Sequence, residues 1–117
     1  MNQEIKRRWV EALRSGEYKQ GREALKCQGQ FCCLGVLCDL HAKETNTKWV
    51  DHINKDFSSD YLDQDSVLPI QVMDWAGTQG SDPVITTRES ISRCITHYND
   101  GERYDFIQLA DLIEQYL

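Results

Sequence analysis

Apolar residues recur at helical spacing along much of the chain. Ile5, Trp9 and Leu13 follow one another every four residues, which predicts an amphipathic helix over residues 2–15 with Asn2 as its cap. The same periodicity, and a proline at a first turn, predict four more helices. They cover residues 34–44, 69–77, 89–98 and 105–116.

Short runs of β-branched and aromatic residues lie between these helices. The runs are 30–33, 48–53 and 84–87. The glycine-punctuated stretch 17–30 predicts an ordered loop or a short strand pair, and the Asp- and Ser-rich stretch 54–65 can supply the second arm of a hairpin. The sequence therefore predicts an α+β fold, with four to five helices packed on a small antiparallel β-sheet in a single compact domain, residues 1–117.

Composition indicates the cellular compartment in which we expect the protein. No apolar run approaches the ~20 residues of a membrane span, and the N-terminal residues lack the apolar stretch of a signal peptide. We therefore expect a cytoplasmic protein without membrane association. Its five cysteines are expected to remain reduced thiols.

Charge is unevenly distributed along the chain. Residues 1–30 contain seven Lys/Arg and four Asp/Glu, a net charge of +3, whereas residues 31–117 contain six and fifteen, a net charge of −9. The overall charge of −6 predicts no direct binding to nucleic acid. The basic N-terminal part can receive an anionic ligand or, alternatively, pair its cations with the acidic remainder.

Four cysteines and a histidine lie close together in the sequence. They are Cys27, Cys32, Cys33, Cys38 and His41. Their spacing lacks the C-x2-C pairs of common zinc sites, and their neighbours are apolar. Free cysteine is often buried, so we expect core packing and predict neither a metal site nor a cofactor. A disulfide between the adjacent pair is disfavoured by its geometry.

Two further patterns have a catalytic or metal-binding alternative. Cys94 and His97 lie three residues apart on a predicted helix, but Cys94 falls on the apolar stripe, which favours packing over a nucleophile–base pair. The segment from Asp56 to Asp60 lacks the D-x-D-x-D-G pattern of a calcium loop and is expected to be a solvated acidic loop. No catalytic residue is predicted.

The most distinctive polar stretch is Tyr18-Lys19-Gln20-Gly21-Arg22. It combines an aromatic ring, two cations and an amide, a set that can stack a base and pair a phosphate. We predict a ligand-binding site formed by Tyr18, Lys19, Gln20 and Arg22, with Asn99 opposite. The alternative is a turn with solvated cations.

Two segments resemble a known group of proteins. They are Trp9–Gly21 and the stretch FCCLGVLCDL at Phe31–Leu40. Together with the ending Asn99-Asp100-Gly101 and Phe106–Leu117, they resemble a widespread group of small uncharacterised proteins encoded by tailed phages and prophages. The resemblance implies a phage accessory protein that acts in the host cytoplasm, and it implies no reaction and no catalytic residues.

These observations lead to a functional expectation and two alternatives. The expectation is a non-enzymatic counter-defence protein, which inhibits a host defence protein or sequesters its small anionic signalling nucleotide. The first alternative is a small enzyme acting on nucleotides or protein, and the second is a structural or regulatory accessory protein of the phage. The sequence contains no heptad repeat and does not predict an oligomeric state.

Overall fold

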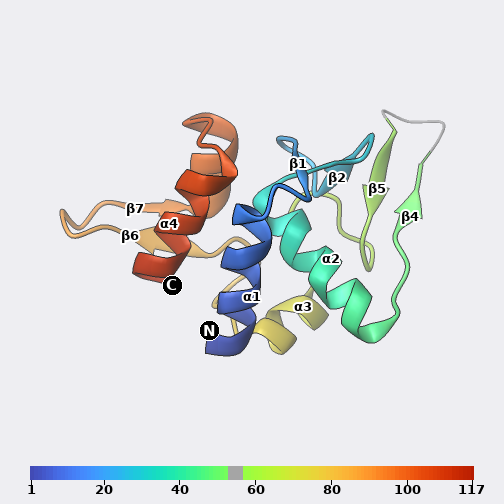
Figure 1. Ribbon diagram of the computed structural model, residues 1–117, viewed down its shortest axis with the longest axis horizontal. Coiled ribbons are helices and arrows are strands. Elements are labelled where there is room, and N and C mark those ends of the chain that lie inside the picture. The colour runs from blue at the N-terminus through green and yellow to red at the C-terminus, as the bar shows by residue number, and fades with distance from the viewer. Residues whose placement is uncertain (53–56) are drawn as a thin grey trace.

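The computed structural model describes residues 1–52 and 57–117 (Figure 1). Its helices are α1 (Gln3–Arg14), α2 (Cys33–Thr45), α3 (Ile70–Ala76), α4 (Phe106–Tyr116) and a π-helical turn, η1 (His97–Gly101). A five-stranded sheet has the order β1-β3-β2-β5-β4, where β1 is Lys19–Gln20, β2 Lys26–Cys27, β3 Gln30–Phe31, β4 Val50–Asp51 and β5 Ser58–Asp60. A second sheet is the hairpin of β6 (Val84–Thr86) and β7 (Ser92–Cys94).

The predicted fold class, α+β in one compact domain, is confirmed. The strand pairs are antiparallel apart from β1 with β3, which run parallel. Helix α1 lies between α4 and α2, and the two sheets lie at opposite ends of the molecule (Figure 1). In the part of the chain that the structure describes, no helix has both the length and the hydrophobicity to cross a membrane.

Helix α1 is anchored to the interior by one aromatic residue. Trp9 is fully buried, and its indole Nε1–H donates to the backbone carbonyl of Cys33, 2.9 Å away. The predicted cap is confirmed, because Asn2 Oδ1 accepts a hydrogen bond from the backbone N–H of Ile5. The hydrogen bond satisfies the buried indole N–H and joins the two helices.

The cysteine-rich segment begins helix α2 earlier than predicted. The extended segment ends at Phe31, and Cys32 caps the helix: its sulfur accepts a hydrogen bond from the N–H of Gly35 at 3.4 Å. Cys32, Cys33 and Cys38 are buried, as predicted for core residues. Gly35 permits this packing, because a Cβ there would lie 1.8 Å from the carbonyl oxygen of Leu25.

The β4–β5 pair forms the hairpin for which the sequence offered residues 54–65 as a second arm. The predicted strand over residues 48–53 is observed as Val50–Asp51, and Ser58–Asp60 supplies the second arm. Residues 53–56 of these two predicted segments lie outside the described residues.

The prediction of a helix over Glu89–Tyr98 is wrong. Thr87 N–H donates to the carbonyl of Ile91, and Ser90 takes a positive φ of 62°, so the chain reverses into the β6–β7 hairpin. The helical periodicity was misleading because Ile91, placed on the buried stripe, is 47% exposed. The β-branched run beginning at Val84 needs a strand partner, and the nearest extended segment supplies it.

Candidate functional site

The predicted ligand-binding loop is divided by the alternation of side chains along β1. Lys19 pairs with Gln30 of β3, and Gln20 pairs with Phe31. Successive residues of a strand point to opposite faces. Lys19 is accordingly exposed, whereas Gln20 donates through Nε2 to Asn99 Oδ1 at 3.2 Å and to the carbonyl of Tyr104 at 2.8 Å.

Asn99 lies at the centre of a buried polar cluster. Its side chain is fully buried, and Oδ1 accepts from the backbone N–H of Cys33 at 3.2 Å as well as from Gln20. Its Nδ2 donates to the carbonyl of Gly21 at 3.2 Å and to Asp100 Oδ1 at 2.6 Å. The structure thus brings Gln20 and Asn99 together, as predicted, but uses both amides to join η1, β1 and the start of α2.

Tyr18 contacts a different part of the molecule. Its hydroxyl donates to Asp39 Oδ2 at 2.6 Å and accepts from Lys43 Nζ at 3.1 Å. Burial and the neighbouring Asp39 raise the pKa of this phenol. The ring packs edge-on against Phe31, with centroids 5.1 Å apart, so Tyr18 contributes to an internal aromatic cluster.

Arg22 is the predicted site residue that borders open space. Its Nη2 donates to the carbonyl of Arg103 at 3.2 Å, and its buried Nε–H has no hydrogen-bond partner among the described residues. It lines two hollows of about 210 and 390 Å³, which also share Ala24 and Cys27. Gln30, on the same sheet face as Lys19, lines the smaller one. Ligand binding by this loop stays a prediction.

Two pairs of polar side chains lie at the β4–β5 strands. Ser59 Oγ donates to Asp51 at 2.6 Å, whereas the His52 imidazole contacts Asp60 at 2.8 Å. Burial raises the pKa of the Cys32 thiol to about 12, which keeps it protonated and unreactive. Over residues 1–52 and 57–117, no group of three or more His, Cys, Asp or Glu side chains is placed to hold a metal ion.

Cys94 and His97, for which packing was expected rather than a nucleophile–base pair, do not share the predicted helix. Cys94 lies on β7 rather than on a helix, and His97 lies in η1, where its Nε2 contacts Glu102 at 3.2 Å. No disulfide joins any two cysteines of the described residues. Cys94 and His97 thus belong to different elements.

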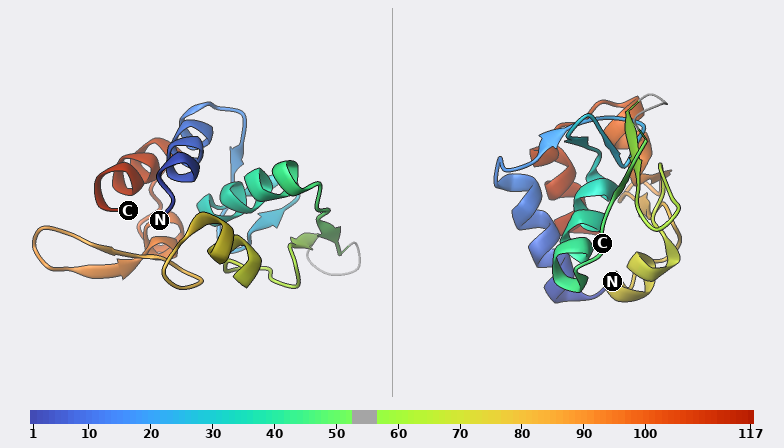
Figure 2. Two further views of the ribbon diagram at one scale, coloured as in Figure 1. Left: turned by 90° about the horizontal axis from the view of Figure 1, so that it is seen from below. Right: turned by 90° about the vertical axis from the view of Figure 1, so that its right-hand side faces the viewer.

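The end of the molecule opposite the large sheet carries exposed apolar side chains. The β6–β7 hairpin extends past α4 in both Figure 1 and Figure 2. Val84 is 50% exposed on β6, and Ile91, just before β7, is 47% exposed. Sequence reasoning missed this surface because it placed Ile91 on a buried helical stripe.

The hairpin has two open edges. The hydrogen bonds from Thr87 N–H to Ile91 O and from Ile95 N–H to Pro83 O show which residue pairs of the two strands are hydrogen-bonded to each other. Hydrogen-bonded pairs alternate with non-bonded ones, so four residues direct their backbone groups outward: Val84, Thr86, Ser92 and Cys94. Their N–H groups donate to none of the described residues.

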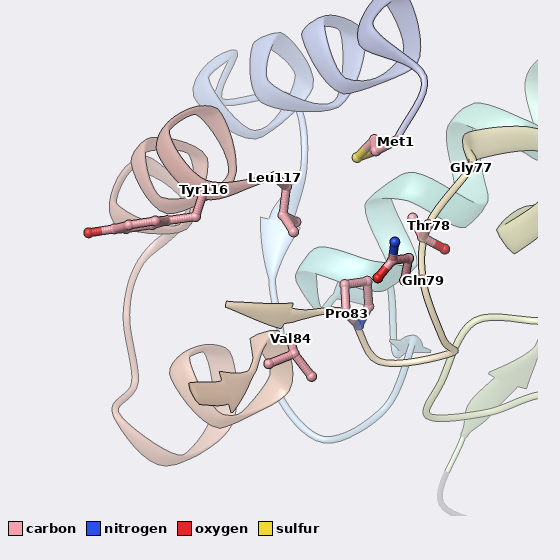
Figure 3. Close-up of a pocket in the computed structure, with 8 residues that line it drawn as sticks. All are labelled: Met1, Gly77, Thr78, Gln79, Pro83, Val84, Tyr116 and Leu117. Carbon is pink, nitrogen blue, oxygen red and sulfur yellow. The ribbon is translucent and has the colours of Figure 1, made fainter. Parts of the chain in front are cut away.

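A hollow of about 330 Å³ borders the base of β6. Figure 3 shows its lining, which comes from the two ends of the chain, the segment after α3 and the start of β6. The apolar members of the lining are Met1, Pro83, Val84, Tyr116 and Leu117. The open β6 edge and this hollow share Val84. We call the two together the β6 site.

Comparison with known proteins places the chain in a family. The family described as a domain of unknown function (DUF8296) matches residues 1–117, so the chain belongs to it. No curated protein and no solved structure matches the chain.

Proposed function

We propose that the protein is a phage-encoded, non-enzymatic binding protein that inhibits a host defence protein by direct contact in the host cytoplasm. The observation that supports contact with a protein is the projecting hairpin, with its open edges and its exposed Val84 and Ile91. Phage origin and counter-defence rest on the resemblance of the Phe31–Leu40 segment and of the flanking segments described above.

The arrangement of the predicted ligand loop favours a protein partner over a small ligand. Three of its five predicted residues, Tyr18, Gln20 and Asn99, have their polar groups engaged inside the protein. A ligand that used them would first have to break these hydrogen bonds. The hairpin offers its surface without such a cost.

The test is a plaque assay in host strains that each carry one defence system. Expression of the wild-type protein is expected to restore plating of a sensitive phage by 100-fold or more in at least one strain. Ile91→Glu places a charge at the exposed end of the hairpin and is expected to abolish the rescue. The matched control is Ile70→Glu, since Ile70 is 66% exposed on α3 and lies in another element.

Two outcomes would contradict the proposal. One is rescue by Ile91→Glu at the wild-type level, which would exclude the hairpin as the contact surface. The other is a lack of rescue by the wild-type protein in every strain of a broad panel. Circular dichroism of both variants verifies that each is folded.

Sequestration of an anionic nucleotide is the second candidate, and the smaller Arg22 hollow favours it, since Glu23 and Asp65 line the larger one. Arg22 lines both hollows, and Lys19 lies on the sheet face of Gln30, which lines one of them. A thermal-shift panel of cyclic and ADP-ribose-type nucleotides tests this candidate. A shift that Arg22→Gln removes would support it, and the absence of a shift with every nucleotide would exclude it.

A further inference from the structure

We infer that the β6 edge binds an extended segment of the partner protein as an added β-strand, with an apolar side chain of that segment in the hollow beside Val84. This inference rests on the proposed function and specifies how the partner is held. Strand addition uses outward-facing backbone groups for affinity and side-chain pockets for specificity. The β6 site supplies both.

A two-stranded sheet gains from a third strand. Hairpins without further strands or packing are of marginal stability in water. In β6–β7, Ile85 is fully buried, whereas Val84 and Ile91 are half exposed. One face is therefore packed against the protein while both edges stay open, so an added strand would complete the ladder and cover apolar surface.

The two edges are not equivalent. On β7, the outward-facing carbonyl of Ser92 accepts a hydrogen bond from Arg93 Nη1 at 2.9 Å. A charged side chain laid along an edge strand is a common protection against pairing. On β6, the backbone groups of Val84 and Thr86 have no such cover among the described residues. The β6 edge is the one available to a partner.

The hollow determines which kind of side chain the added strand places opposite Val84. Residues paired across adjacent strands point to the same face, so the partner residue opposite Val84 would lie on the side of the Val84 side chain, which lines the hollow. The hollow measures about 330 Å³, within the ~300–1,000 Å³ range of ligand pockets. Its lining is about equally polar and apolar, and its apolar members, Met1, Pro83 and Leu117 among them, can contact an aliphatic or aromatic side chain.

The net charge of the chain indicates which charged residues the partner segment carries. The chain has a net charge of −6, and residues 31–117 alone have −9. Opposite charges on two proteins speed their association, whereas like charges repel each other. The partner segment is therefore expected to be extended, with apolar residues at alternate positions and Lys or Arg among the others. A second copy of this acidic chain is the less favoured occupant.

Selection from a displayed library of random nine-residue peptides tests the inference directly. Peptides enriched on the folded full chain are expected to alternate apolar with basic residues. Addition of a synthesised enriched peptide is expected to slow amide hydrogen exchange at Val84 and Thr86 at least tenfold. Exchange at Ser92 and Cys94, on the other edge, is expected to stay unchanged.

Backbone variants provide the matched control. Thr86→Pro removes an outward-facing N–H without breaking the ladder, because proline is tolerated where an edge N–H faces solvent. It is expected to weaken peptide binding at least tenfold. Thr86→Val keeps the N–H and Ser92→Pro alters the other edge, so both are expected to bind within threefold of wild type.

Several outcomes would overturn the inference. They are the absence of any enriched peptide, protection confined to Ser92 and Cys94, and protection of Val84 without peptide in a concentration-dependent dimer. If Thr86→Pro does not fold, the exchange measurement on the wild-type chain still decides. Rescue in the plaque assay that is lost in Ile91→Glu but kept in Thr86→Pro would leave the proposed function intact and exclude strand addition.

Discussion

Around Asn99, four hydrogen bonds fill both polar atoms of a fully buried side chain, whereas along β6 the N–H groups of Val84 and Thr86 meet no described partner. The first region joins three elements that are distant in sequence. The second is exposed at the end of a hairpin. An unpaired polar group is costly only when it is buried, so the interior has to satisfy its polar groups, while the hairpin can leave some free for a partner.

Gly35→Ala tests the close packing of the interior and has the largest expected effect. The added Cβ would lie 1.8 Å from the carbonyl oxygen of Leu25, a backbone atom. We expect a loss of at least about 3 kcal/mol in the free energy of unfolding, measured by urea denaturation. The control is Gly101→Ala, whose Cβ would meet His97 Nδ1 at an ordinary 3.5 Å. Equal stability of the two variants would contradict the close approach of α2 to Leu25.

Asn99→Leu tests the buried polar cluster. It leaves the backbone N–H of Cys33 and the carbonyl of Gly21 without these partners. The free energy of unfolding is expected to fall by about 2–3 kcal/mol. The control is Gln115→Leu, which replaces an exposed amide side chain and should change the free energy of unfolding by less than about 0.5 kcal/mol. If Asn99→Leu were as stable as wild type and bound nucleotide less well, Asn99 would instead belong to a ligand site.

The pH dependence of stability reports on His41, which is buried against aromatic rings. Its Nδ1 contacts the Tyr61 hydroxyl at 2.6 Å, and burial lowers its pKa, an effect that Glu44 partly opposes. The unfolded chain therefore takes up this proton at higher pH than the folded one. Stability from this residue is present above about pH 6.5 and is lost as the pH falls towards the folded-state pKa.

Two measurements verify the behaviour of His41. An NMR titration is expected to give its imidazole a pKa below that of an exposed histidine. Urea denaturation at pH 7.5 and 5.5 is expected to show a smaller loss of stability in His41→Phe than in wild type. The same pH dependence in both proteins would mean that other groups are responsible.

Substitution of the exposed hairpin residue Ile91 has the smallest expected effect on stability. Ile91→Thr is expected to change the free energy of unfolding by less than about 0.5 kcal/mol, because this side chain is 47% exposed. Ile85→Thr in the same hairpin should cost about 2 kcal/mol, because Ile85 is fully buried. A large loss in Ile91→Thr would show that the hairpin surface serves stability rather than binding.

The segment from Val84 to Tyr98 shows where sequence patterns fail. Its residues satisfy a helical period over 89–98, yet Ile91 is exposed and the chain forms a hairpin followed by a π-helical turn. The turn is closed by the bond from Glu102 N–H to the carbonyl of His97. Periodicity over ten residues does not reveal which strand will pair with an adjacent β-branched run. The pairing of Val84 with Cys94 decided the outcome.

The candidate site was predicted only in part. The expectation that Asn99 lies opposite the loop agrees with the contact between Gln20 and Asn99, whereas ligand binding there stays a prediction, and the sequence gives no sign that Asn99 would be fully buried. The β6 site was not predicted at all. It depends on the hydrogen-bond register of the β6–β7 hairpin and on the place where the chain ends meet β6. The register requires the hairpin that the helical pattern concealed, and the hollow arises from contacts between residues far apart in sequence.

The sequence by itself determined the helices α1, α2, α3 and α4, the cap at Asn2, and the α+β class. These features depend on local spacing and on side chains that bond to their own backbone within a few residues. Only the tertiary structure decided which polar groups form hydrogen bonds in the interior and which strand edges stay unpaired. Burial and strand pairing are set by the whole chain, and no short segment of sequence contains them.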